Sequence, residues 1–397
     1  MKTASQRQYY FDWLRVGAFG LLFVFHALRF FDDYPWHIKN DQSSLAVNYF
    51  VEFVHNWRMQ LIFLISGMGT YFAMRSRGKQ FMRDRWLRLV VPFVFGAILL
   101  VPPQKYFEAV HQGIWTGSLG DFLLAYPASL WSASLETDLG WTGFLGYHLW
   151  YLPYLFIQTL LLLPLLRRWQ QRPNGQGWVG TTLGIKVKWR GILWLMVVLE
   201  FILRPWYPDY LSWADFAVYT SYFLIGHALA IQPQWVTRME KYWAVLLGAG
   251  VVCTGLSWVF ANHLATWSVP SHSIPYLGVL LVKNINCLVW VLGWVALAKR
   301  WLNVDHPWRH DLNQGILPFY MLHQTVIVAV GFFVVQHPMS LWVKFGLILV
   351  LSLALTLGLY QLIWRSRVMR FLFGMRKAKK RAERWWIKSS AFRRARW

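Results

Sequence analysis

Cysteine is scarce in this sequence: among 397 residues only Cys253 and Cys287 occur, and both lie in apolar segments. Two isolated cysteines supply neither a disulfide framework nor the paired spacing of a zinc site. The sequence therefore excludes a fold that depends on disulfide bonds, and we expect no metal ion.

Charged residues are also few, at 14% of the chain, whereas 56% of the residues are apolar and 18% are aromatic. This balance excludes an ordinary soluble domain. Acidic residues are especially scarce: 17 stand against 40 lysines and arginines, which gives a net charge of +23. The basic residues cluster between apolar runs, so membrane topology and anionic lipid explain them better than nucleic acid, and we expect no nucleic-acid partner.

Ten apolar runs have the length of a membrane-spanning helix. They lie near residues 11–30, 50–74, 87–104, 147–166, 190–204, 213–231, 242–262, 276–298, 315–336 and 341–364. We therefore predict an all-α fold, a polytopic membrane helix bundle of about ten transmembrane helices. The first run shows no cleavage pattern and is expected to be retained. The stretch from Phe122 to Trp131 is expected to form a re-entrant or interfacial helix.

The segments between these runs differ strongly in charge. Alternate segments carry 32 of the 40 lysines and arginines: 1–10, 75–88, 167–190, 232–241, 299–314 and 365–397. Because such segments stay on the cytoplasmic side, both termini are predicted to be cytoplasmic. Residues 1–364 then form the transmembrane domain, and 365–397 form a polybasic tail that we expect to bind anionic lipid.

The first apolar run contains three ionisable residues, Asp12, Arg15 and His26. Such residues are costly in lipid and normally face a protein interior or a wet cavity. Arg15 and His26 are eleven residues apart, so on a helix they share a face and lie ~16 Å apart along the axis. A purely structural alternative is an interfacial Asp12–Arg15 ion pair with His26 bonded to a neighbouring helix.

Other spans carry further polar groups. Arg85 and Arg88 share a helix face at the cytoplasmic boundary, and an arginine fork suits phosphate. His148 begins the fourth long run and His323 lies within the ninth. At the outer end of the second run lie Glu52, His55 and Arg58, which fit either an interfacial charge cluster or a site. A merely structural bundle rarely needs so many histidines and arginines at membrane depth.

Four local patterns occur in order along the chain. The first is FDWLR followed by FVFHA, which holds Arg15 and His26; the others are HNWRMQLIFLISGMG, RDRWLRLVVP and YHLWYL. In these patterns the sequence resembles the integral-membrane acyltransferase 3 family over roughly residues 7–370, although Tyr151 replaces the phenylalanine that is usual in the family's form of the last pattern. It is most similar to the branch that acylates cell-envelope glucans and polysaccharides.

The resemblance implies O-acyl transfer from a cytoplasmic acyl-CoA donor to a hydroxyl of an envelope glucan or polysaccharide, in a bacterial inner membrane. Arg15, Arg85 and Arg88 would then hold the CoA phosphates. His26 would act as general base or carry the acyl group covalently.

Three further residues receive roles from the same resemblance. Asp12 would pair with Arg15, His148 would lie near the acceptor, and His323 would orient the donor or a partner residue.

Two other classes of function remain open from the residues alone. A transporter or flippase for an anionic lipid or carbohydrate would also place arginine and histidine along its substrate path, but no inverted repeat is evident. A non-catalytic membrane scaffold would leave the alignment of Arg15 with His26 unexplained. The sequence leaves open the acyl group, the acceptor and the oligomeric state.

Overall fold

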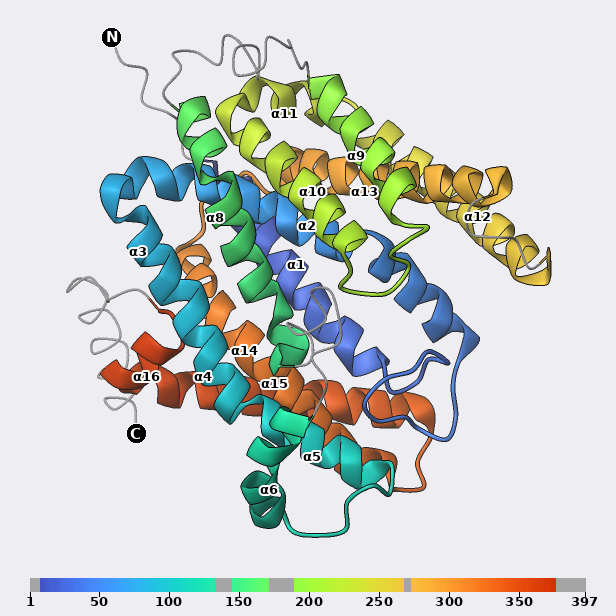
Figure 1. Ribbon diagram of the computed structural model, residues 1–397, viewed down its shortest axis with the longest axis vertical. Helices are drawn as coiled ribbons and strands as arrows, with labels where there is room; N and C mark the ends of the chain where they lie inside the picture. The colour runs from blue at the N-terminus through green and yellow to red at the C-terminus, as the bar shows by residue number, and fades with distance from the viewer. Residues whose placement is uncertain (1–7, 133–144, 171–188, 268–272, 376–397) are drawn as a thin grey trace, which may run out of the picture.

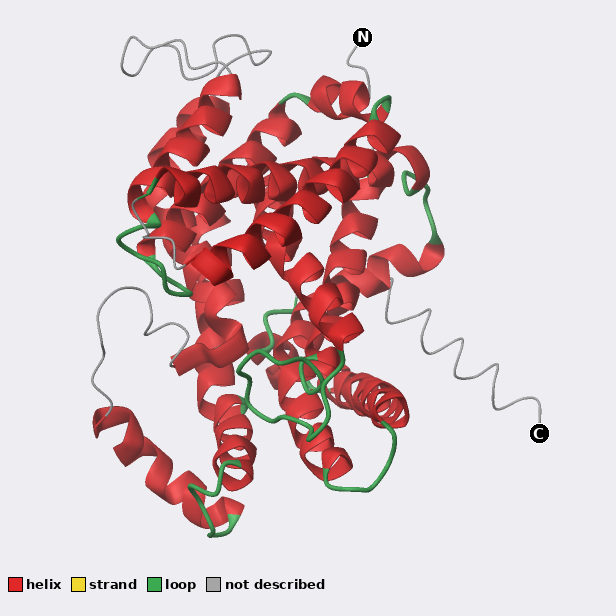
Figure 2. Ribbon diagram, turned by 90° about the vertical axis from the view of Figure 1, so that its right-hand side faces the viewer, coloured by secondary structure: helices red, strands yellow, loops and turns green. Residues whose placement is uncertain are grey.

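The structure is a computed structural model that describes residues 8–132, 145–170, 189–267 and 273–375. Within these residues all regular structure is helical and no strand occurs (Figure 2). The predicted all-α bundle is therefore confirmed. The polybasic tail is described only as far as residue 375, and the rest of that predicted segment lies outside the described residues.

The helices follow the apolar runs closely. In chain order they are α1 (Tyr9–Leu28), α2 (Leu45–Arg77), α3 (Phe81–Arg85), α4 (Val91–Leu99), α5 (Val101–His111), α6 (Leu119–Ser132), α8 (Tyr151–Gln170), α9 (Trp189–Leu203), α10 (Trp213–Ile231), α11 (Pro233–Glu240), α12 (Trp243–Trp267), α13 (Ile274–Trp301), α14 (Pro307–Val335), α15 (Leu341–Arg365) and α16 (Arg367–Leu372). Three short turns join them: the 3-10 helices η1 (Gly78–Gln80) and η3 (Tyr147–Trp150) and the π-helix η2 (Trp86–Val90).

Among the described residues, eight helical segments are long and apolar enough to cross a membrane, against ten predicted runs. The second and third runs fall within one continuous segment, Leu45–His111. The fifth corresponds to α9, whose 15 residues span only about 22 Å, less than the ~30 Å of a bilayer core. The stretch predicted to be re-entrant or interfacial forms α6, which is not one of the eight segments.

The segment Leu45–His111 folds back on itself at Gly78. This residue ends α2 with a φ of +51°, a conformation that glycine adopts without the steric cost of a Cβ atom. The chain then continues through α3, α4 and α5 as a second arm that diverges from α2 and reaches α14 through α5 (Figure 1). The turn places the basic stretch between the second and third runs at the same end of the bundle as the start of α1.

Helix α1 lies inside the bundle, where it packs against α2, α13, α14 and α15. Large side chains along its length are fully or nearly fully buried, including Tyr10, Phe23 and Phe25. By contrast, α12 and α15 present apolar side chains outward, as helices that face lipid do. The charged positions of α1 therefore face the interior of the protein.

Helices α2 and α10 cross at very close range. A Cβ atom on Gly67 would overlap the carbonyl oxygen of Phe223, and one on Gly226 would overlap the carbonyl oxygen of Leu64. Small residues at a crossing allow two backbones to approach, which is how helices associate strongly in membranes. This crossing fixes α2, which carries Ser66 and Arg58 toward the interior.

We expect Gly67→Ala to destabilise the protein by about 1–3 kcal/mol, because the added methyl group forces α2 and α10 apart. Gly69→Ala is the matched control, since its Cβ would meet only Phe11, at 3.5 Å. Thermal melting of both variants in detergent tests the expectation. A Gly67→Ala melting temperature equal to that of Gly69→Ala would show that the crossing is not tight.

Candidate active site

Two cavities lie one after the other along α1. The first, of about 140 Å³, is lined by Arg15, Arg85 and Arg88, and we call it the arginine cavity. The second, of about 410 Å³, is lined by His26 and His148 among others, and we call it the histidine cavity. The structure thus brings the three arginines singled out in the sequence to one cavity and places His26 in the next.

The arginine cavity is built where the second arm begins. Arg85 ends α3 and donates a hydrogen bond from Nη2 to the hydroxyl of Thr70 on α2. Arg88 lies in the π-helix η2 and donates from Nε to the carbonyl oxygen of Gly374, at 3.2 Å. A π-turn shifts the side chains that follow it and is frequent at functional sites. The buried Nε of Arg85 has no partner among the described residues and can still donate to a ligand.

Three aromatic side chains, Phe19, Tyr151 and Tyr320, line both cavities and form the wall between them. The Tyr151 hydroxyl donates to Ser66 Oγ, which itself donates to the carbonyl oxygen of Ile62 at 2.8 Å. The Tyr320 hydroxyl donates to the carbonyl oxygen of His148. The wall is therefore made of rings held in place from α1, α2, α8 and α14.

His26, His148 and His323 form a cluster beside the histidine cavity. The ring centroid of His323 lies 5.2 Å from that of His26 and 5.3 Å from that of His148. These residues come from α1, η3 and α14, so the cluster joins three distant parts of the chain. Within the described residues no group of three or more His, Cys, Asp or Glu side chains is arranged to hold a metal ion.

Hydrogen bonds fix the tautomers of two of these histidines. His148 donates from Nε2 to the carbonyl oxygen of Met321 at 3.0 Å, so its Nδ1 accepts from the amide of Gln104 at 3.4 Å. His323 donates from Nδ1 to the carbonyl oxygen of Tyr320, which leaves its Nε2 as an acceptor. That Nε2 and the Nδ1 of His26 are both buried without a partner among the described residues.

Arg58 and His55, from the polar group near the start of the second run, also line the histidine cavity. Arg58 is only 7% exposed, and its guanidinium lies over the Phe25 ring, 3.4 Å from the centroid. The third member of that group, Glu52, is instead bonded to the hydroxyl of Tyr34. Of the three residues that the sequence groups together, His55 and Arg58 therefore line the cavity, whereas Glu52 contacts the loop between α1 and α2.

Sequence reasoning missed a second set of cavity residues around His37. His37 donates from Nδ1 to Glu108 at 3.0 Å and accepts at Nε2 from the amide of Gln324, also at 3.0 Å. Its ring stacks on Tyr147, whose hydroxyl donates to the same carboxylate at 2.7 Å. Because His37 lies in the loop between α1 and α2, helical spacing could not assign it to this cavity.

An ion-pair network holds that loop in place. Asp32 is 1% exposed and pairs with Arg29 at 3.0 Å and with Lys39 at 2.6 Å. Burial raises the pKa of Asp32 above its ordinary value, although the hydrogen bond from Lys39 and the charge of Arg29 act against it. Burial likewise lowers the pKa of Lys39. The loop therefore depends on a partly desolvated ion pair at the edge of the histidine cavity.

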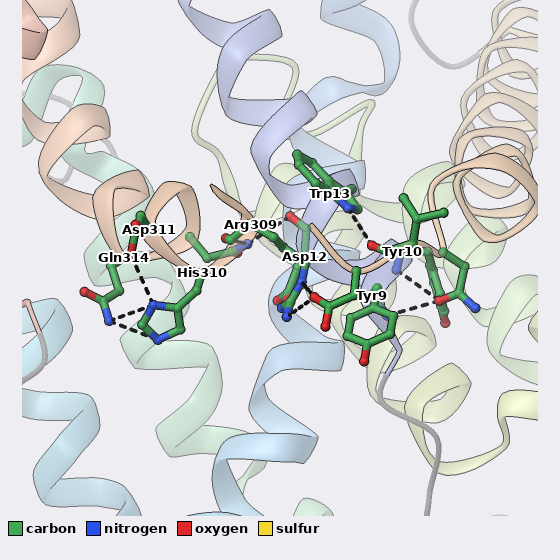
Figure 3. A network of polar contacts seen from close by, with 12 residues as sticks. Tyr9, Tyr10, Asp12, Trp13, Arg309, His310, Asp311 and Gln314 are labelled. Atoms are coloured by element: carbon green, nitrogen blue, oxygen red, sulfur yellow. Dashed lines mark hydrogen bonds and ion pairs between the residues drawn. The ribbon is translucent and has the colours of Figure 1, made fainter. Parts of the chain in front are cut away.

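Asp12 makes a long-range contact that the sequence did not predict. Figure 3 shows its carboxylate against Arg309 of α14, and the amide of Asn313 donates to the Asp12 carbonyl at 3.4 Å. Arg309 also pairs with Asp305 at 2.9 Å. Asp12 lines neither cavity. It therefore anchors the start of α1 to α14, while its negative charge also acts favourably on Arg15. Arg309 lies too far along the chain for local spacing to reveal this contact.

Comparison with known proteins agrees with this architecture. The sequence model of the acyltransferase 3 family, described as an acyltransferase domain, matches residues 8–361. Glucans biosynthesis protein C of Escherichia coli O139:H28 (strain E24377A / ETEC) is 24% identical over an alignment of 413 positions that covers 95% of this chain and 97% of that protein. The protein of the same name from Escherichia coli (strain K12) is 24% identical over 401 residues, with the same coverage. No solved structure matches. Since the family match covers most of the sequence, this chain belongs to the acyltransferase 3 family and is an integral membrane acyltransferase.

Proposed function

We propose that this enzyme moves an acyl group from a cytoplasmic acyl-CoA donor to a hydroxyl of a cell-envelope glucan or polysaccharide. The observation that carries the proposal is the pair of cavities along α1, one basic and one containing histidine, which share the lining residues Phe19, Tyr151 and Tyr320. The name of the E. coli relatives supports a glucan acceptor. The excess of basic residues in alternate loops supports the orientation.

The arginine cavity suits the nucleotide end of the donor. Coenzyme A carries several phosphates, and arginine binds phosphate through a planar, permanently charged fork. Arg15 from α1 converges there with Arg85 and Arg88 from the second arm, at the end predicted to face the cytoplasm. The extended pantetheine arm then has to cover the ~16 Å of helix rise that separates Arg15 from His26.

The histidine cavity suits a carbohydrate acceptor. Four of its lining side chains are Trp36, Tyr147, Trp150 and Tyr210, whose rings offer flat apolar faces with polar edges. A sugar ring packs its C–H faces on such surfaces while its hydroxyls bond to neighbouring polar groups. The amide oxygen of Gln324 lines the same cavity, has no hydrogen-bond partner among the described residues and supplies such a group.

His26 is the residue positioned to act on the acceptor hydroxyl. In the proposed step the hydroxyl oxygen attacks the thioester carbonyl carbon while its proton passes to the His26 imidazole. The tetrahedral intermediate then collapses, the C–S bond breaks, and the imidazolium returns the proton to the CoA thiolate. An ester and free CoA result, and no other reactant is required.

The two other histidines of the cluster, His323 and His148, assist His26 without contacting the acceptor hydroxyl. His323 has its Nδ1–H bonded to Tyr320, so its Nε2 can accept a hydrogen bond from Nδ1–H of His26 and stabilise the imidazolium. In His148 both ring nitrogens are already engaged, which favours a positioning role in the wall of the cavity. This division of roles follows the general logic of a base oriented by a second group.

Transfer of an isotopically labelled acyl group tests the proposed function. The purified protein in liposomes, given labelled acyl-CoA and an envelope glucan, is expected to place the label on the glucan and release CoA. Counterflow of a substrate without acyl-CoA consumption would contradict the proposal and indicate a carrier. Omitting the glucan distinguishes a covalent carrier, which retains label on His26, from a general base, which does not.

His26→Ala is expected to lower kcat by about 10²–10⁴-fold, because the acceptor proton loses its base. Expression and membrane insertion should be unchanged. His310→Ala is the matched control, since His310 is exposed and contacts only its neighbours Asp311 and Gln314 in the described structure (Figure 3). Wild-type turnover in His26→Ala would remove the catalytic assignment.

Arg15→Ala is expected to raise the KM for the donor about 10- to 100-fold, since a hydrogen bond to a charged group contributes roughly 1.5–3 kcal/mol. The kcat at saturating donor should change much less. Steady-state kinetics with varied acyl-CoA measure both values, and Arg300→Ala, at an exposed position of α13, serves as control. An unchanged KM would argue against phosphate capture by Arg15.

A further inference from the structure

Arg58 is a buried cation whose charge is not balanced by a carboxylate. It is 7% exposed, and its Nε and Nη1 atoms have no hydrogen-bond partner among the described residues. Its described surroundings include the face of Phe25, the hydroxyls of Tyr210 and Tyr219 and the charge of Arg29. None of these carries a negative charge in its ordinary state at neutral pH.

Two other arginines with little exposed surface, Arg204 and Arg309, are paired with carboxylates. Arg204 pairs with Glu200 at 2.8 Å and with Asp215 at 2.7 Å. Arg309 pairs with two aspartates. Burying an arginine without such a partner costs several kcal/mol, so proteins rarely do so without a use for the charge. Arg58 therefore points to an anionic oxygen that a ligand supplies.

The position of Arg58 locates that oxygen. Arg58 stacks on Phe25, which directly precedes His26 on α1, and both Arg58 and His26 line the histidine cavity. The charge of Arg58 is close enough to act on the His26 imidazole. The other arginine that lines this cavity, Arg29, already bonds to Asp32 and to the carbonyl oxygen of Pro35. Arg58 is thus the cavity arginine that retains N–H groups for a ligand within the described chain.

We infer that Arg58 stabilises the oxyanion of the acyl-transfer intermediate, an assignment that rests on the proposed function. When the acceptor hydroxyl attacks the thioester carbon, the carbonyl π electrons move to oxygen and the hydroxyl proton moves to His26. The negative oxygen then accepts hydrogen bonds from the Arg58 guanidinium. When the C–S bond breaks, the electrons return and the carbonyl re-forms.

The stacking on Phe25 matters for this role. A guanidinium held against a ring keeps its position before the substrate arrives, so little reorganisation is needed as charge develops. Donors of this kind act strongly in a water-poor site because the local dielectric is low. An arginine that served only to hold a charged group of the substrate would strengthen binding of the ground state equally and leave kcat unchanged.

Arg58→Gln tests the assignment, with Arg300→Gln as the matched control and Arg58→Lys as the conservative variant. We expect Arg58→Gln to lower kcat about 10²–10³-fold, the usual effect of losing one oxyanion donor. The donor KM should stay within a few-fold of the wild type, and Arg58→Lys should recover at least tenfold of the lost kcat. Melting temperatures in detergent confirm that each variant is folded.

Binding of two CoA thioethers tests whether Arg58 serves the oxyanion that forms only during the reaction or a carboxylate that the acyl group carries permanently. One analogue carries a neutral S-alkyl group and the other an S-carboxyalkyl group, and neither can react. We expect Arg58→Gln to bind both as tightly as the wild type does. Tenfold weaker binding of the carboxyalkyl analogue alone would overturn the inference and make Arg58 a receptor for a carboxylate on the acyl group.

An unchanged kcat in Arg58→Gln would also overturn the inference while leaving the proposed function intact. Failure of the proposed function has a different signature, because the wild-type protein would then consume no acyl-CoA. The two outcomes are therefore distinguishable in one set of assays.

Discussion

A charged side chain inside a membrane must find a partner or a cavity, and this constraint organises the whole molecule. Helix α1 carries Arg15 and His26 through the centre of the bundle, so the surrounding helices have to leave space beside both. Asp12 is accommodated by Arg309 instead, which ties the start of α1 to α14. The two cavities and the anchor are consequences of placing these three residues on one buried helix.

The packing of the helices around α1 determines where the polar side chains of the two cavities lie. Close contact of α2 with α10 at Gly67 and Gly226 holds Arg58 and Ser66 at defined depths. Ser66 in turn bonds Tyr151 in the wall between the cavities. In lipid there is no water to compensate a misplaced polar group, so a small shift of α2 would disturb both the wall and the histidine cavity. Structural glycines and functional polar residues are thus coupled through one helix.

The sequence predicted much of this arrangement because the length of an apolar run and the spacing on one helix are local properties. The helix bounds follow the apolar runs, and the eleven-residue separation places Arg15 and His26 beside successive cavities. The partner of Asp12 and the contact of His37 with Glu108 could not be predicted in this way. Both join segments far apart in the chain, and periodicity holds no information about which helices become neighbours.

The most direct test of the account is a cryo-EM structure of the protein with a non-hydrolysable acyl-CoA thioether. The account predicts the CoA phosphates against Arg15, Arg85 and Arg88, the pantetheine arm passing the aromatic wall, and the acyl end beside His26. A donor analogue that entered the histidine cavity from its other end, or that bound outside both cavities, would contradict it.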